Sequence, residues 1–402
     1  MCVSIIIRNF VHLKRFAGLK MRKIMFMTKQ YKTLFFCGLM AITQLSFAQK
    51  ITVGQYTFKD GSVYNGQLTN GKPNGKGKTV FLTGDTYEGE YLKAKRHGEG
   101  TYAFVDGEKY EGSWVNDHQH GHGTYVFSNG NRYEGLWYTD YQEGHGTMTY
   151  HNGDKYVGDW HQDMREGEGT YTWSNGAFYR GSWAGDKKNG KGLFDWGDGS
   201  TYYGDMKDDV REGYGSYIYA NGDAYKGQWK NDMMDGKGIY TFKNGDKYEG
   251  EYVAGKRQGQ GIFTYVDGNR YMGSFKNGMM DGFGTYTWAD GSVYEGYWVE
   301  DHQQGRGKYT NKDGDLYDGN WLAGEMHGEG VLRMKDGYKF KGLFSNGKKN
   351  GKCVEEDKDG IRFEGSYVDD VRDGAFVEKD RNGAVLRKGY YKKGVIEVTN
   401  NN

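Results

Sequence analysis

The chain of 402 residues has one proline, Pro73, three cysteines, and few aliphatic side chains for its 67 glycines. Scarce leucine, isoleucine and valine argue against a helical bundle, whose core depends on them. Cys2 and Cys37 fall in a basic N-terminal stretch, so Cys353 stands alone in the remainder and no internal disulfide is expected there. The composition is instead aromatic, with Phe, Trp and Tyr making up 16% of the residues.

Acidic residues are missing from residues 1–48, which carry eight Lys or Arg. Without this segment the chain has 46 basic and 53 acidic residues, a net charge of −7. A mildly acidic body has no general attraction to nucleic acid or anionic lipid, and no nucleic-acid partner is expected. The stretch from Tyr338 onward is the local exception, with 14 basic and 11 acidic residues.

The N-terminal pattern is typical of an export signal that begins late in the sequence. Lys29 and Lys32 form a positive segment, and residues 34–45 form a short apolar run. Ser46 and Ala48 are small residues at the two positions that a signal peptidase requires, so we expect cleavage after Ala48. A membrane anchor is the alternative, but the apolar run is shorter than the roughly 20 residues that a spanning helix needs.

Residues 1–48 are therefore predicted to be an N-terminal extension followed by a cleavable signal peptide. The unusual length of the basic region indicates that translation begins at Met25 or Met27. Cys37 lacks the small preceding residues of a lipoprotein signal, so lipid attachment is not expected. The mature protein is predicted to be exported, to the periplasm, the cell surface or the medium.

A 23-residue repeat runs through almost the whole chain. Its marker is an aromatic residue followed two positions later by glycine, and the marker recurs fourteen times without an insertion. A period of this length indicates a stacked array and one elongated body. The marker aromatics are Tyr64, Tyr87, Tyr110, Tyr133, Tyr156, Tyr179, Tyr202, Tyr225, Tyr248, Tyr271, Tyr294, Tyr317, Phe340 and Phe363.

Each repeat contains two stretches in which aromatic residues or glycines alternate with polar residues, which predicts two β-strands. Asp or Asn followed by Gly lies between successive repeats, and this dipeptide is the strongest short-range hairpin signal. If the aromatic residues of both strands are to lie on the same face, the loop between the strands must contain an odd number of residues. A three-residue loop over 105–107 with a left-handed Gly107 satisfies this requirement. This register places Tyr102 opposite Tyr110.

A Gly-x-Gly pair recurs in the second strand of the repeats, from Gly75 and Gly77 to Gly328 and Gly330. Glycine weakens a strand, so its recurrence requires a structural reason. In the predicted register these glycines share a face with the aromatic residues. We expect large rings from neighbouring strands to lie flat across the glycine backbone.

The terminal repeats depart from this pattern. After Phe340 the Gly-x-Gly pair is lost, and the usual inward aromatics are replaced by Glu355, Asp357, Glu378 and Asp380. We expect a polar C-terminal edge that prevents end-to-end strand addition. The predicted parts of the mature chain are an N-terminal cap at 49–63, regular repeats at 64–339, and degenerate repeats with a polar cap at 340–402.

The unit Tyr110-Glu-Gly-Ser-Trp114, followed by Gly121-His-Gly-Thr-Tyr125 and Asn129-Gly130, resembles the MORN (membrane occupation and recognition nexus) repeat. The resemblance covers roughly residues 56–391. It implies an all-β fold, an elongated, single-layer antiparallel array of about 14 β-hairpin repeats. It also implies a role in protein contacts, often with membrane association or self-association. Leu68 and Met206 replace the usual Trp, which affects local packing only.

No break in the repeat brings unlike groups together, so we predict no catalytic residues, no cofactor and no enzymatic activity. The Gly-x-Gly pairs have strand on both sides, whereas a phosphate-binding loop leads into a helix. His118, His120 and His122 alternate and are weak candidates for a zinc site. The alternative is that His simply precedes Gly-x-Gly in such units, as His327 does.

A stripe of tryptophans recurs at one repeat position, with Tyr or Phe at most equivalent positions. The rings are interpreted either as the repeat core or, where partly exposed, as partner-binding aromatics. The leading hypothesis is an exported scaffold that binds another protein or itself. The alternatives are phospholipid binding through the basic end near Lys349 and Lys388, and cell-surface carbohydrate binding through the stripe. The stripe consists of Trp114, Trp137, Trp160, Trp183, Trp229, Trp298 and Trp321.

Overall fold

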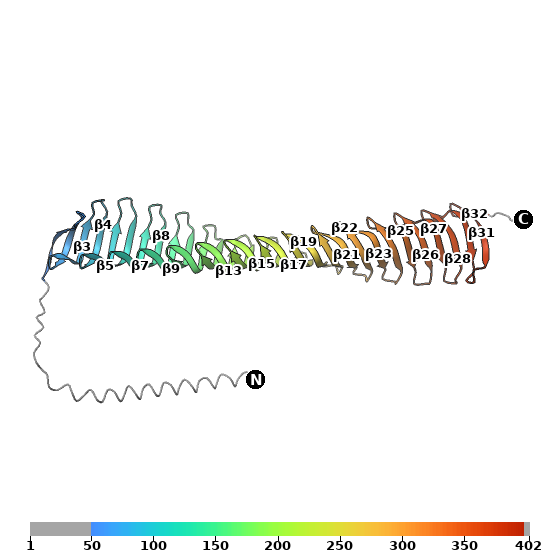
Figure 1. The fold of residues 1–402 in the computed structure, drawn as a ribbon, viewed down its shortest axis with the longest axis horizontal. Coiled ribbons are helices and arrows are strands. Elements are labelled where there is room, and N and C mark those ends of the chain that lie inside the picture. The colour runs from blue at the N-terminus through green and yellow to red at the C-terminus, as the bar shows by residue number, and fades with distance from the viewer. Residues whose placement is uncertain (1–49, 398–402) are drawn as a thin grey trace, which may run out of the picture. The chain divides into compact units, whose positions relative to one another are not determined.

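The computed structural model describes residues 50–397, which form one antiparallel sheet of 32 strands and contain no helix (Figure 1). Each strand pairs with its neighbour in the sequence, with two short strands, β29 and β30, both lying against β28. The predicted all-β hairpin array is confirmed. The predicted signal peptide, residues 1–48, lies outside the described residues. No helix capable of crossing a membrane is found within 50–397.

The strand bounds follow the repeat. They are β1 (Ile51–Thr57), β2 (Val63–Thr69), β3 (Lys72–Val80), β4 (Thr86–Leu92), β5 (Lys95–Ala103), β6 (Lys109–Val115), β7 (His118–Val126), β8 (Arg132–Tyr138), β9 (Tyr141–Thr149), β10 (Lys155–His161), β11 (Met164–Thr172), β12 (Phe178–Ala184), β13 (Lys187–Asp195), β14 (Thr201–Lys207), β15 (Val210–Ile218), β16 (Ala224–Lys230), β17 (Met233–Thr241), β18 (Lys247–Val253), β19 (Lys256–Thr264), β20 (Arg270–Lys276), β21 (Met279–Thr287), β22 (Val293–Val299), β23 (His302–Thr310), β24 (Leu316–Leu322), β25 (Glu325–Arg333), β26 (Lys339–Ser345), β27 (Lys348–Glu356), β28 (Arg362–Val368), β29 (Val371–Arg372), β30 (Gly374–Lys379), β31 (Val385–Lys392) and β32 (Val395–Glu397).

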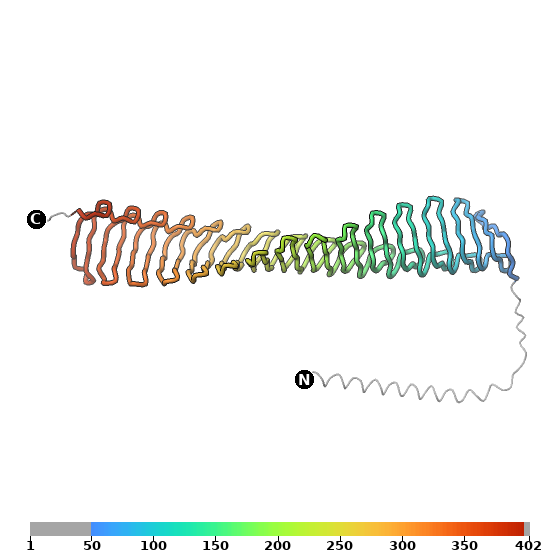
Figure 2. Tube along the Cα trace, turned by 180° about the vertical axis from the view of Figure 1, so that it is seen from behind, coloured from blue at the N-terminus to red at the C-terminus, as the bar shows by residue number. Residues whose placement is uncertain are grey.

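The sheet is a narrow ribbon whose strands run across its long axis. Figure 2 shows the connecting turns along its two long edges. The ribbon twists along its length, as strands of L-residues do, so its middle part is seen nearly edge-on in Figure 1. One side carries the aromatic rings and is called the aromatic face below, and the opposite side is called the charged face.

The three-residue loops at one edge have the predicted form. Between β5 and β6, the Gly107 N–H donates to the Phe104 carbonyl at 3.2 Å, and the Phe104 N–H donates to the Glu108 carbonyl at 2.9 Å. Gly107 has a φ of +94°, the left-handed conformation that favours glycine. The predicted register is confirmed, with Tyr102 paired with Tyr110.

The other edge carries two-residue turns, which the sequence pattern did not predict. Asn116 and Asp117 both have positive φ, 53° and 77°, as a type I′ hairpin turn requires. The register then shifts between Gly112 and Trp114, because β7 contains a bulge at Gly121, whose φ is +65°. Each repeat therefore consists of one long strand with a bulge and one short regular strand.

The two glycines of a Gly-x-Gly pair have different roles. A Cβ on Gly100 would lie 2.5 Å from Cζ of Tyr87, because that ring lies across the backbone, as predicted. Gly98 has instead a φ of +65°, and its Cβ would meet Glu90 on the charged face. Ring packing thus explains the second glycine only, and the bulge conformation explains the first.

The C-terminal repeats keep the strand pairing but change the interior. Glu355 and Glu378, predicted on a polar edge, are only 4% and 8% exposed. Arg372 joins them, with its Nη2 2.7 Å from Glu355 Oε2 and its Nη1 3.8 Å from Glu378 Oε1. Its guanidinium lies 3.9 Å from the ring centroid of Phe363. These carboxylates belong to a buried ion network rather than to a solvated edge.

Candidate binding face

The marker tyrosines form the innermost row of the aromatic face. The twelve from Tyr64 to Tyr317 are 0–2% exposed. Each hydroxyl reaches a backbone carbonyl three residues further on, as Tyr110 donates to Ser113 at 3.0 Å. Burial raises the pKa of Tyr248 to about 12, so this hydroxyl stays protonated at neutral pH. The row is structural and offers no reactive group to a ligand.

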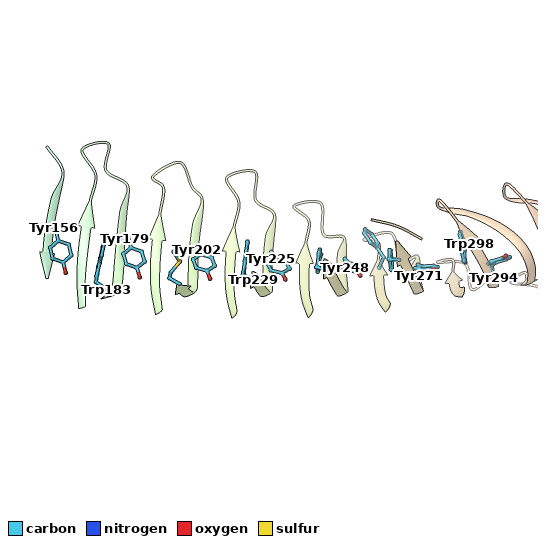
Figure 3. Packing of buried hydrophobic residues seen from close by; sticks show 14 of the residues in the cluster. Tyr156, Tyr179, Trp183, Tyr202, Tyr225, Trp229, Tyr248, Tyr271, Tyr294 and Trp298 are labelled. Carbon is cyan, nitrogen blue, oxygen red and sulfur yellow. The ribbon is translucent and has the colours of Figure 1, made fainter. Parts of the chain in front are cut away.

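The tryptophans of the predicted stripe lie between the marker tyrosines, as Figure 3 shows for Trp183, Trp229 and Trp298. The ring of Trp114 makes T-shaped contacts with Tyr87 at 5.3 Å and with Tyr110 at 5.1 Å. Its indole N–H donates to the Gly100 carbonyl at 3.1 Å. All seven rings are 3–9% exposed, which places them in the core of the sheet and leaves little ring surface for a partner.

Long side chains from the bulged strands cover several of these tryptophans. The Cζ atoms of Arg96, Arg165 and Arg211 lie 4.3, 4.4 and 4.3 Å from the ring centroids that they cover. Each guanidinium also donates to the carbonyl of an Asp in the next two-residue turn, as Arg165 does to Asp186 at 2.7 Å. A guanidinium over an indole face is favourable. We call these side chains and their equivalents the covering row.

A second aromatic row, directly before the Asp-Gly or Asn-Gly loops, is half-buried and accessible. Its rings contact those of a parallel row two residues earlier, with Trp196 4.2 Å and Trp173 5.0 Å from Phe194. We call it the loop-side aromatic row: Phe58, Phe81, Phe104, Phe127, Tyr150, Trp173, Trp196, Tyr219, Phe242, Tyr265 and Trp288. These residues recur every 23 positions in the sequence, but their alternation with polar residues does not distinguish them from the deeper stripe, which the structure shows to be more buried.

Carboxylates in the loops hold the tyrosines beside this row. Tyr171 donates to Asp154 at 2.7 Å and Tyr240 donates to Asp223 at 2.8 Å. The hydrogen bond from Tyr171 lowers the pKa of the Asp154 carboxyl, and the Lys243 backbone N–H, together with Tyr240, lowers that of Asp223. These pairs fix the edge of the aromatic face.

We expect the sheet to lose stability as the pH falls below about 4, the ordinary pKa of an unfolded aspartate. The pKa values of Asp154 and Asp223 are lower in the folded than in the unfolded chain. Their contribution to stability is therefore complete above the unfolded pKa and is lost as the pH falls through the folded pKa. Thermal unfolding between pH 6 and pH 2, followed by circular dichroism, measures this loss of stability. Tyr171→Phe with Tyr240→Phe is expected to flatten the profile, and an equally steep profile in that variant contradicts the assignment.

The three candidate histidines do not converge on one point. His118 Nδ1 lies 2.5 Å from Asp140 Oδ2, and the His120 ring lies 5.2 Å from that of Tyr138. His122 is exposed. Across residues 50–397, no group of three or more His, Cys, Asp or Glu side chains is arranged to hold a metal ion.

The charged face carries exposed aromatics that the sequence analysis also missed. Tyr203, Tyr214, Phe283 and Tyr297 are 49–59% exposed, and the last two rings are 5.5 Å apart in a T-shaped contact. They occupy positions next to a repeat glycine or tryptophan, where most repeats have a polar residue.

Cys353 is buried, and burial raises its pKa to about 11, which keeps the thiol protonated and unreactive at neutral pH.

Comparison with protein families gives thirteen matches to the MORN repeat, each starting on a marker aromatic. They cover residues 64–86, 87–109, 110–132, 133–155, 156–178, 179–201, 202–224, 225–247, 248–270, 271–293, 294–316, 317–337 and 340–362. The chain belongs to the MORN repeat family. The predicted fourteenth repeat, from Phe363, follows the last match. MORN membership supports a repeat scaffold or binding module.

No curated protein matches this MORN chain. Solved structures match it weakly. The TCP domain of SAS-4 from Drosophila melanogaster, in complex with a proline-rich motif of Ana2, is 13% identical, with 44% of this chain and 90% of that chain covered and a TM-score of 0.26. The G-box domain of the microcephaly protein CPAP is 13% identical, with 56% and 100% covered and a TM-score of 0.22. Scores this low carry no argument about this MORN array.

Proposed function

We propose that the mature chain is an exported scaffold that binds another protein, or a second copy of itself, along its aromatic face. The observation that carries this proposal is the half-buried loop-side aromatic row, which includes Trp173, Trp196 and Trp288. Rigid aromatic rings with a polar rim are the groups that dominate protein interfaces. Because the row extends over many repeats, it suits a long contact rather than a single small ligand.

The groups available on this face favour a protein partner over lipid or carbohydrate. Lys349, in the basic end, donates to the Tyr338 hydroxyl at 2.8 Å and lies 4.7 Å from the Phe340 ring centroid, so it is engaged within the sheet. The net charge of −7 without residues 1–48 opposes binding to anionic lipid. The deeper tryptophan stripe is buried, so it cannot stack on a sugar without rearrangement.

Site-specific photo-cross-linking tests the binding face. A benzophenone amino acid replaces Trp196 on the loop-side aromatic row, and Lys237 on the charged face serves as the matched control. We expect specific protein adducts from position 196 and none from position 237. The adduct forms either with a partner protein or with a second copy of the chain. In the second case sedimentation velocity should show dimers. Adducts from neither position with a monomeric protein, or binding only to anionic liposomes in flotation, would contradict the proposal.

Export is tested separately on the protein produced in its own cells. We expect the extracytoplasmic fraction to contain a chain whose N-terminus is Gln49, because the predicted cleavage follows Ala48. Intact-mass measurement and N-terminal sequencing of each fraction check this. A chain that retains residues 29–48 in the cytoplasm rules out the predicted export.

A further inference from the structure

A pocket opens on the aromatic face where two successive repeats lack a covering cation. It has a volume of about 570 Å³. Glutamine takes the place of the arginine or lysine of the covering row in both repeats. We call this site the double-glutamine pocket, and its central residues are Gln119, Trp137, Asp140, Gln142, Trp160 and Asp163.

The neighbouring repeats show what fills the same place elsewhere in this chain. In one of them the Arg96 backbone N–H donates to Asp117 Oδ1 at 2.8 Å, while its guanidinium lies over Trp114 and donates to the Asp117 carbonyl at 2.8 Å. Arg211 and Asp232 repeat this arrangement further along the sheet. Indole face, carboxylate and turn carbonyl together form a guanidinium site that the chain fills from within.

In the double-glutamine pocket the receiving groups are present and the guanidinium is not. The Gln119 N–H donates to Asp140 Oδ1 and the Gln142 N–H to Asp163 Oδ1, both at 2.8 Å, as in the arginine-containing repeats. The two glutamine residues are 8% and 5% exposed. Both line the pocket, and their side-chain amides make no hydrogen bond to any group within residues 50–397.

The charge around the pocket is negative. Asp163 is paired with no Lys or Arg side chain of the described sheet, and Asp140 has only His118, at 2.5 Å. Arg165 borders the pocket, but its guanidinium is paired with Asp186 and lies over Trp183. A cation entering the pocket therefore meets two carboxylates, and Trp137 and Trp160, each 5% exposed, form part of the pocket wall.

We propose that the double-glutamine pocket binds two arginine side chains from an extended segment of a partner protein. The inference rests on the proposed protein-binding function and names the chemistry of the partner. Successive repeats are two strand spacings apart, about 10 Å. A polyproline-type segment advances about 9 Å in three residues and returns to the same side. The matching partner sequence is therefore Arg-x-x-Arg.

The test uses fluorescence anisotropy of the purified protein with a fluorescein-labelled peptide, Gly-Pro-Arg-Pro-Pro-Arg-Pro-Gly. A second peptide has citrulline, the uncharged isostere, in place of both arginines. We expect the arginine peptide to bind at least about tenfold more tightly, because charge-assisted hydrogen bonds are lost with citrulline. Equal binding of the two peptides, or no binding of either, overturns the inference while leaving the cross-linking test of the scaffold intact.

A self-filled variant provides the decisive control. The double variant Gln119→Arg with Gln142→Arg recreates the arrangement of Arg96 in both repeats. Its melting temperature should be unchanged or raised, and it should no longer bind the arginine peptide. Met280→Arg adds the same kind of side chain beside Trp298 and Asp301, outside the pocket, and should bind like the wild type. Undiminished peptide binding by the double variant, or an equal loss in Met280→Arg, overturns the inference.

Discussion

Gly169→Ala is expected to lower the free energy of unfolding by about 3 kcal/mol, at the upper end of the cost of overpacking a core. An added Cβ would lie 2.5 Å from Cζ and 2.6 Å from Cε2 of Tyr156, and closer still to its hydroxyl. That ring is fully buried, and its hydroxyl is held by the Asp159 carbonyl at 3.1 Å. Denaturant unfolding measured by tryptophan fluorescence tests the expectation.

Gly176→Ala is the matched control, because a Cβ there meets no atom within 4 Å. Its φ of +91° still makes alanine unfavourable, at a cost of about 1 kcal/mol. If the two substitutions cost the same, ring packing is not what requires the glycine at position 169.

The chain itself indicates a compensating change for Gly169→Ala. Where the equivalent glycine is replaced, by Cys353 or Phe376, the marker tyrosine is also replaced, by Phe340 or Phe363. Loss of the hydroxyl therefore accompanies loss of the glycine. We expect Tyr156→Phe to restore part of the stability lost in Gly169→Ala, which a double-mutant cycle measures as a coupling between the two positions.

Arg372→Met is expected to cost about 3–5 kcal/mol, the range for breaking a buried ion pair from one side. Its removal leaves the carboxylate of Glu355, whose side chain is 5% exposed, without its cation in the interior, while Glu378 keeps its pair with Arg387. Since stability in a repeat array is roughly a sum of local terms, the loss should appear as faster hydrogen exchange confined to the C-terminal repeats. Combining it with Glu355→Gln should recover part of the stability.

Arg165→Gln is the comparison for that experiment. It introduces the residue that occurs naturally as Gln119 and Gln142, and Asp186 lies in an exposed turn. The expected cost is only about 1 kcal/mol, that of a partly exposed cation–π contact. If Arg372→Met is no more destabilising than Arg165→Gln, the C-terminal network does not depend on its buried charges.

The strand pattern, the three-residue loops and their register were predictable because they depend on residues close together in one repeat. Alternation fixes the two faces, and Asp106-Gly107 fixes the loop and hence the pairing of Tyr102 with Tyr110. The two-residue turns are marked less regularly. Asn277-Gly278 and Asn346-Gly347 carry the Asn-Gly signal, but the equivalent Asn116-Asp117 contains no glycine, so the signal does not recur in every repeat.

The candidate site was harder to predict because exposure depends on side chains from another strand. Trp114 is buried because Arg96, eighteen residues earlier, lies over it, and this arginine sits in a stretch that resembles a polar connection. At the same position Gln119 and Gln142 line the pocket, whereas the neighbouring repeats on either side carry Arg96 and Arg165. The residue at this variable position, rather than the repeated motif itself, distinguishes one part of the aromatic face from another.

Strand order in the sheet is the same as strand order in the chain, and this has a consequence for folding. Every strand finds its partner within the next few tens of residues, so no pairing waits for a distant segment to be synthesised. Low contact order of this kind speeds folding even in an all-β protein. From β1 to β32, a growing chain can add one hairpin at a time to a single growing edge of the sheet.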